Sequence, residues 1–137
     1  MSRRVAGWMI CACLFLSAWP AGAHHAFAAE FDYKRPLKLQ GKVTKMDWVN
    51  PHSWIHLDVT GADGQTVSWM IEGGSPNALL RRGFTKSALP PGSEVVVEGF
   101  QATDGSNRAV GQSVAFADGR KLFLGGSAPG ANGESNQ

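Results

Sequence analysis

The chain has 137 residues, of which 43% are hydrophobic, and its 13 basic side chains nearly balance 11 acidic ones. This length is enough for one domain with a single hydrophobic core. Both cysteines, Cys11 and Cys13, lie near the start. A chain trimmed beyond them has no disulfide, no thiolate metal site and no cysteine nucleophile.

Residues 1–23 have the parts of a secretory signal peptide, with Arg3 and Arg4 first, an apolar stretch at 5–19, and small residues that end at Ala23. We expect cleavage after Ala23 and a periplasmic or secreted protein. The apolar stretch is shorter than the about 20 residues of a membrane span. No membrane span is therefore expected after cleavage, and an uncleaved anchor is the alternative.

Cleavage would leave 114 residues with no net charge. The 13 basic residues include Arg3 and Arg4, so 11 basic side chains remain to balance the 11 acidic ones. A protein that binds nucleic acid by neutralising phosphates carries a clear excess of positive charge. The mature chain is therefore not expected to bind nucleic acid.

Beyond the signal, alternating apolar and polar residues predict strands from residue 37 onwards. In the first of these strands the alternation of apolar and polar residues shifts by one position between Val43 and Met46. This shift indicates a β-bulge near Thr44 or Lys45. Residues 50–52, Asn-Pro-His, form the next expected turn. The further expected strands are residues 54–60, 66–72, 94–102, 108–117 and 120–124.

One short helix is expected at residues 77–82, between the third and fourth strands. Ser75 is a good N-cap, Pro76 suits the first helical position, and Gly83 suits the exit. This order of elements is that of an OB-fold. We predict a mainly β domain, a small OB-fold-like barrel of five or six strands. An open roll or a small sandwich would show nearly the same pattern.

Three regions are therefore expected along the chain. They are the signal peptide at residues 1–23, a single β-domain at 24–125, and a tail at 126–137. The tail is rich in Gly, Ser and Asn and has no large apolar residue. Such a segment does not bury enough surface to offset its ordering entropy, so the tail is expected to be disordered.

Two segments carry specific motifs: residues 24–32 read His-His-Ala-Phe-Ala-Ala-Glu-Phe-Asp, and residues 48–54 read Trp-Val-Asn-Pro-His-Ser-Trp. Both resemble an exported bacterial family, domain of unknown function 6152. Residues 72–77 and 118–120 also look like its pattern, more weakly. The family has no settled activity, so the resemblance implies export and a single small β-domain but no reaction.

The four histidines all fall in the first third of the expected mature chain; they are His24, His25, His52 and His56. Cleavage after Ala23 would give His24 a free α-amino group, which can hold one metal ion together with its ring Nδ1. A second imidazole completes a three-nitrogen set that suits Cu(II). This set is similar to the histidine brace of exported copper proteins. His52, in the expected turn, is the better second ligand, and His56 is the alternative.

Further candidates surround these histidines. Asp58 shares a strand face with His56, so we expect it to orient the His56 ring. Trp54 lies on the same face and offers an aromatic wall for a sugar, a base or a peptide side chain. The remaining candidates, placed near the mature start or in the turn, are Glu30, Asp32 and Asn50.

Plain structural roles are the alternatives for these residues. The His24–His25 pair would then lie free in solvent, His52 would bond within its own turn, and His56 would be an ordinary strand residue. Trp48 and Trp69 are expected to pack in the core because they fall on the apolar phase of their strands. For Trp54, core packing and exposure both remain open.

The common catalytic arrangements are missing, since no serine sits in a nucleophile elbow and no paired-histidine zinc helix occurs. The sequence therefore favours a small exported binding or accessory module without catalysis. Its partner would be a small ligand, a metal ion or a periplasmic protein, and copper is the candidate cofactor. The alternatives are a copper-dependent oxidative enzyme and a metal-free module that binds a peptide or a polysaccharide.

Overall fold

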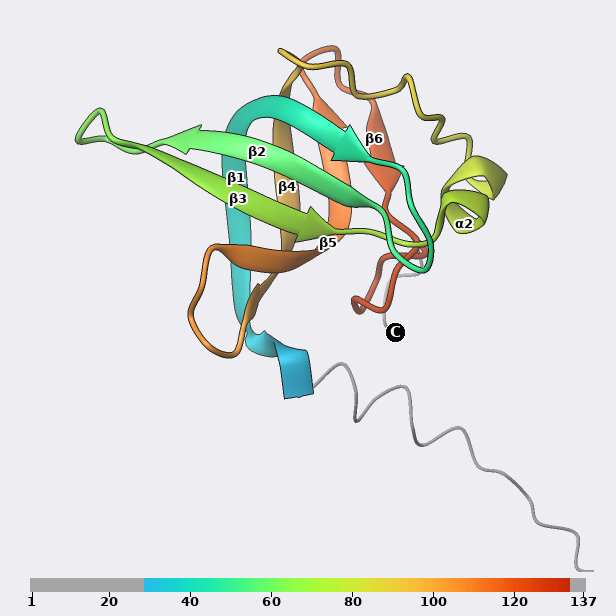
Figure 1. Cartoon of the computed structure of the whole chain (residues 1–137), viewed down its shortest axis with the longest axis horizontal. Coiled ribbons are helices and arrows are strands. Elements are labelled where there is room, and N and C mark those ends of the chain that lie inside the picture. The colour runs from blue at the N-terminus through green and yellow to red at the C-terminus, as the bar shows by residue number, and fades with distance from the viewer. Residues whose placement is uncertain (1–28, 134–137) are drawn as a thin grey trace, which may run out of the picture.

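The computed structural model describes residues 29–133, whose elements are shown in Figure 1. The elements are β1 (Phe31–Asp47), β2 (Trp54–Thr60), β3 (Thr66–Glu72), α2 (Pro76–Arg81), β4 (Glu94–Ala102), β5 (Arg108–Phe116) and β6 (Lys121–Phe123). The predicted mainly β class, with one short helix between the third and fourth strands, is confirmed. Each expected strand is present, with bounds that differ by a few residues at most except at the start of β1.

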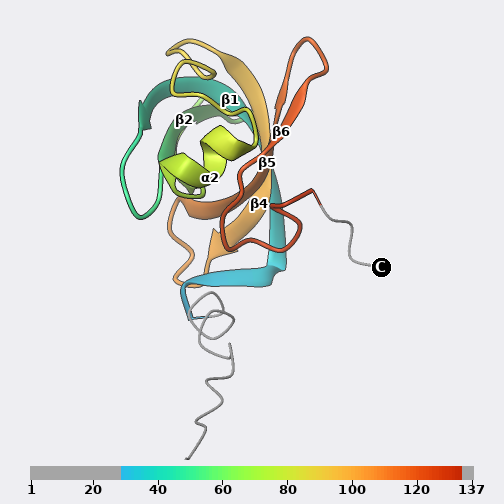
Figure 2. The ribbon, with the colours of Figure 1, turned by 90° about the vertical axis from the view of Figure 1, so that its right-hand side faces the viewer.

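The strands close into a ring. The sheet order is β3-β2-β1-β4-β5-β6 with antiparallel neighbours, and β3 also pairs with β5 in parallel, at Met70–Glu72 and Arg108–Val110. Five strands thus form the ring, and β6 adds to it beside β5. Closure of this kind removes most unpaired strand edges. Figure 2 shows α2 lying across the opening of the ring.

Strand β1 is long because it serves two partners. Its first part pairs with β4, from Pro36 to Lys42, and its second part pairs with β2, from Lys42 to Asp47. The register shifts between Val43 and Lys45, which confirms the predicted bulge. Gly41 lies where β1 passes from one partner to the other. A methyl group there would overlap the backbone oxygen of Asp58, so only glycine permits this close approach.

The core fills the inside of the ring and continues under the helix. Inward side chains of the strands are fully buried, among them Leu57, Ile71 and Val97. The six-residue helix is too short to be stable alone, and Leu79 holds it against this core. Its start is as predicted, because the Ser75 hydroxyl accepts a hydrogen bond from the Ala78 amide at 3.3 Å.

Trp48 and Trp69 pack against the core as predicted, although each is only partly buried. For Trp69 the reason is the shape of the β2–β3 hairpin, whose turn extends beyond the ring in Figure 1. Side chains on the inward phase of β3 lose their cover towards this turn, so Val67 is 39% exposed whereas Ile71 is fully buried.

The expected disordered tail differs from the structure over residues 126–133. Ala128 and Ala131 are buried in a second apolar cluster with Phe31, Ala102 and Val110. The Gln112 side chain donates a hydrogen bond to the Pro129 carbonyl at 2.9 Å. Two small alanines and one hydrogen bond from a strand side chain thus hold this part of the tail against the domain. Residues 134–137 lie outside the described part.

The predicted signal peptide at residues 1–23 also lies outside the described residues, as do His24 and His25. Between residues 29 and 133 there is no helix with the length and apolar character that crossing a membrane requires.

Replacing Gly41 with alanine is expected to destabilise the fold by about 1–3 kcal/mol, because the new methyl group would push against fixed backbone. Gly73→Ala is the control, since its methyl group would meet Leu124 at an ordinary 3.7 Å. Urea unfolding followed by tryptophan fluorescence measures both variants. Equal stability of Gly41→Ala and Gly73→Ala would contradict the close approach of β1 and β2.

Candidate functional site

His52 and Glu72 form a pair at the point where β2 begins and β3 ends. The His52 Nδ1 lies 3.0 Å from the Glu72 Oε1. The His52 side chain is 46% exposed, whereas the Glu72 side chain is only 5% exposed. A buried carboxylate therefore holds the inner nitrogen of a ring that otherwise faces solvent. With Glu72 ionised, Nδ1 carries the proton that it donates, and Nε2 is the nitrogen with a lone pair.

Backbone hydrogen bonds between the neighbours of His52 and Glu72 hold this pair in place. The Ser53 amide donates to the Gly74 carbonyl at 3.0 Å, and the Gly73 amide donates to the Ser53 carbonyl at 2.9 Å. These bonds extend the β2–β3 pairing beyond both strand ends. The backbone next to His52 is therefore held against the backbone next to Glu72. Gly74 packs closely against another part of the chain, since a methyl group there would overlap the backbone of Gly125.

Glu72 sits among charged neighbours from three other segments. Burial raises its pKa above the ordinary value, and the nearby Glu30 carboxylate raises the pKa further. His52 and Arg108 act in the opposite direction and lower the pKa. The net direction is upward, so burial outweighs the two favourable partners. Glu72 is thus a carboxyl group that resists ionisation while it orients a histidine.

Arg108 joins this group to the start of the described chain. Its Nη2 lies 2.6 Å from the Glu30 Oε1, in an ion pair whose side chains are 35% and 49% exposed. The Arg108 guanidinium also lies over two aromatic rings, 5.5 Å from the centre of Trp54 and 5.9 Å from that of Phe31. Trp54 is partly buried. Part of the predicted aromatic wall is therefore covered by an arginine of the same chain.

His56 has a different carboxylate from the one predicted. Its Nε2 lies 2.8 Å from the Asp47 Oδ2, and Lys45 Nζ lies 2.6 Å from the Asp47 Oδ1. The prediction that Asp58 orients His56 is wrong, because Asp58 instead accepts a hydrogen bond from the Ser68 hydroxyl at 2.6 Å. Side chains on adjacent strands approach more closely than residues two apart on one strand.

The hydrogen bonds from Lys45 and His56 lower the pKa of Asp47, with Lys45 the larger influence. Sequence reasoning missed Asp47 because only the register of β1 against β2, after the bulge, brings it to His56. The Asp32 side chain accepts a hydrogen bond from the Lys34 amide within β1, at 2.9 Å. Asn50 is exposed and precedes a cis peptide bond to Pro51.

The structure therefore gathers three predicted residues, Glu30, His52 and Trp54, around two that were not predicted, Glu72 and Arg108. Among residues 29–133, no three His, Cys, Asp or Glu side chains form a group that would hold a metal ion. Protein metal sites commonly use three or four protein ligands. A metal site at His52 would therefore need a ligand from outside the described range.

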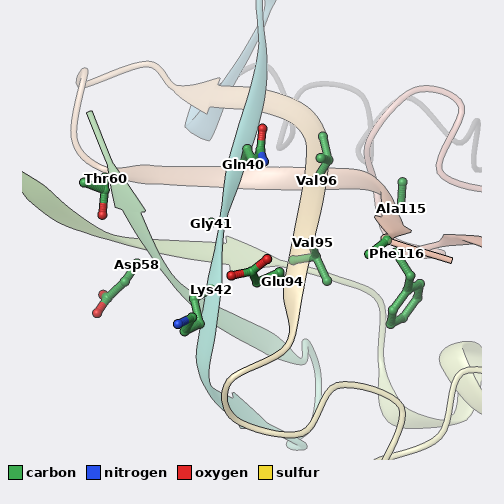
Figure 3. A pocket seen from close by; sticks show the side chains of 11 residues that line it. Gln40, Gly41, Lys42, Asp58, Thr60, Glu94, Val95, Val96, Ala115 and Phe116 are labelled. Carbon is green, nitrogen blue, oxygen red and sulfur yellow. The ribbon is translucent and has the colours of Figure 1, made fainter. Parts of the chain in front are cut away.

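An open groove of about 490 Å³ crosses β1, β2, β4 and β5 (Figure 3), and neither His52 nor His56 lines it. Lys42 lies there between Asp58 and Glu94, which are its direct partners on the neighbouring strands. None of the ion pairs in the described part of the chain joins Lys42 to either carboxylate. Of the predicted site residues that lie within 29–133, only Asp58 lines this groove.

The Glu72 carboxyl group gives a pH dependence of defined sign. Because its pKa is raised from 4.5, its contribution to stability is full below pH 4.5 and is lost as the pH rises through the folded-state pKa. Glu72→Gln cannot titrate. Its stability relative to the parent protein should therefore increase between about pH 4 and pH 6, as measured by urea unfolding.

Glu98→Gln is the matched control with the opposite sign. The hydrogen bond from Lys121 lowers the pKa of Glu98, so the stability that Glu98 contributes is lost as the pH falls. The relative stability of this variant should decrease as the pH rises, and mainly below pH 4.5. The same direction for both variants would show that Glu72 is not held in a destabilised charged form.

Comparison with known proteins places the chain in a family without naming a reaction. The model of the Family of unknown function (DUF6152) matches residues 12–112. This range includes Glu30, His52, Glu72 and Arg108. No curated protein and no solved structure matches the chain. Because the matched range covers well over half of the sequence, the protein belongs to this family of unknown function.

Proposed function

We propose that this protein is an exported binding module that holds Cu(II) between the free N-terminus at His24 and the ring of His52. The His52–Glu72 pair carries the proposal. A buried carboxylate 3.0 Å from Nδ1 orients a ring that is 46% exposed. In protein metal sites, such a carboxylate fixes the ring and strengthens the other nitrogen as a ligand.

The surroundings favour His52 over His56 as the second imidazole. The His56 Nε2 already contacts Asp47, and the Lys45 ammonium group lies 2.6 Å from the same carboxylate. A positive charge so close opposes the binding of a metal cation. The His52 side chain is also more exposed than the His56 side chain, at 46% against 26%. His56 is accordingly the weaker candidate.

The place where the chain enters the fold supports the role of His24. The carbonyls of Ala29 and Glu30 accept hydrogen bonds from the Thr103 hydroxyl, at 3.1 and 3.3 Å. Glu30 lies near enough to Glu72 to raise its pKa, and Glu72 contacts His52. His24 precedes Ala29 by five residues, which span up to about 17 Å when extended. This reach supports a shared site.

The proposed ligands suit copper. The amine and Nδ1 of His24 with Nε2 of His52 give three nitrogens, and Cu(II) prefers nitrogen ligands in a tetragonal arrangement. A copper-dependent oxidative enzyme would use the same ligands and would add an open position and a substrate surface. A metal-free interaction module would use the same strand face. Neither alternative is favoured by a specific contact in the structure.

The free amine of His24 provides the first test of copper binding. Mature protein that begins at His24 should bind Cu(II) about 100-fold more tightly than the same protein with an acetylated His24 amine, which is about 2.7 kcal/mol. Acetylation removes the basic lone pair of the amine and leaves the His24 ring in place. Competition calorimetry with glycine as the competing ligand measures both affinities. Equal affinities would rule out a terminal amine ligand.

The second imidazole is tested by two matched variants of the mature protein. His52→Gln should weaken Cu(II) binding at least about tenfold, and the electron paramagnetic resonance spectrum should lose coupling to one nitrogen. His56→Gln should leave both unchanged. The reverse pattern would transfer the role to His56. Unchanged binding in both variants would exclude a shared site with either ring and would favour a metal-free module.

A further inference from the structure

The first described residues are held by a polar clamp, which consists of Glu30, Thr103 and Arg108. The Thr103 amide donates to the Glu30 carbonyl at 3.0 Å, and the Thr103 hydroxyl reaches the carbonyls of Ala29 and Glu30. Arg108 binds the Glu30 carboxylate at 2.6 Å. Both backbone and side chain of Glu30 are therefore held from the β4–β5 turn and the start of β5.

The clamp has an effect beyond the attachment of β1 to the sheet. Phe31 follows Glu30 directly, is 2% exposed, and pairs with Ala102 in the second apolar cluster. This burial is sufficient to attach the beginning of the strand. The clamp acts one and two residues earlier, where no large apolar side chain is available. It therefore orders the backbone that leads towards the N-terminus.

Contacts connect the clamp to His52. The Arg108 guanidinium lies over the ring of Trp54, and Trp54 is directly opposite Glu72 on β3. Glu72 in turn contacts His52. The same arginine thus contacts the start of the chain and the wall of the histidine site.

We infer that Arg108 and Thr103 are positioning residues that direct the start of the mature chain towards His52. The inference rests on the proposed function, because its consequence is the approach of the His24 ligands to His52. Ordering the backbone of one residue lowers a binding constant by about five- to thirty-fold. A clamp that orders residues 29 and 30 before copper arrives removes part of this penalty, which is the usual benefit of preorganisation.

The direction in which loss of Arg108 changes copper affinity distinguishes a positioning role from a simple effect of its charge. Arg108 is positive, so removal of its charge alone should tighten the binding of a cation. Loss of positioning should weaken binding instead. An exposed ion pair of this kind also adds little to global stability, so a stability change cannot account for a large change in copper affinity.

The test uses mature protein from His24 and its Glu30→Gln/Arg108→Gln double variant, which leaves the net charge unchanged. Cu(II) affinity measured by competition calorimetry should fall about tenfold. Thr103→Val, which removes the hydroxyl without changing any charge, should shift affinity in the same direction. In copper-free protein, amide hydrogen exchange at Glu30 and Phe31 should be faster in both variants.

Asp118→Asn/Arg120→Gln is the matched control. Arg120 also pairs with a carboxylate, at 2.7 Å, and lies 4.6 Å from the centre of an aromatic ring, that of Phe116. This control should leave copper affinity and amide exchange at residues 30 and 31 unchanged.

Two outcomes would overturn the clamp. The first is unchanged affinity in the Glu30→Gln/Arg108→Gln variant while binding still requires the free His24 amine. The second is unchanged amide exchange at Glu30 and Phe31. If acetylation of the His24 amine leaves the copper affinity of the parent protein unchanged, the proposed function fails instead. The exchange measurement then still decides whether the clamp orders the start of the chain.

Discussion

The parallel pairing of β3 with β5 is the constraint on which the candidate site depends. Only three residues of each strand take part, Met70–Glu72 and Arg108–Val110. This short contact closes the ring and brings Arg108 to the edge where Trp54 and Glu72 lie. Without it, the clamp on Glu30 and the His52–Glu72 pair would belong to separate parts of an open sheet. The closing contact therefore assembles the site as well as the fold.

A buried carboxyl group with a raised pKa is an unfavourable feature in a small domain. Glu72 is 5% exposed, and its favourable partners do not outweigh its burial. An apolar residue at the end of β3 would pack there without this penalty. The position of Glu72 beside His52 accounts for this feature, because the carboxylate fixes the orientation of the His52 ring. Perturbed carboxyl groups that orient histidines are frequent at functional sites.

Local sequence patterns were sufficient for the elements and insufficient for the site. The slip of the apolar phase after Val43 predicted the bulge, and Ser75 with Pro76 predicted the start of the helix, because both signals are local. The partner of His56 required the register of β1 against β2, so Asp58 was predicted where Asp47 is found. Glu72 and Arg108 carry no local signal, since their roles arise from the ring closure.

The most direct test of the proposed centre is a crystal structure of the mature chain, purified from its exported form and loaded with Cu(II). One ion should be bound by the amine and Nδ1 of His24 and by Nε2 of His52. Glu72 should remain on the opposite nitrogen of the His52 ring, and Glu30 should remain on Arg108. An ion bound elsewhere, or a first residue other than His24, would contradict the central claim.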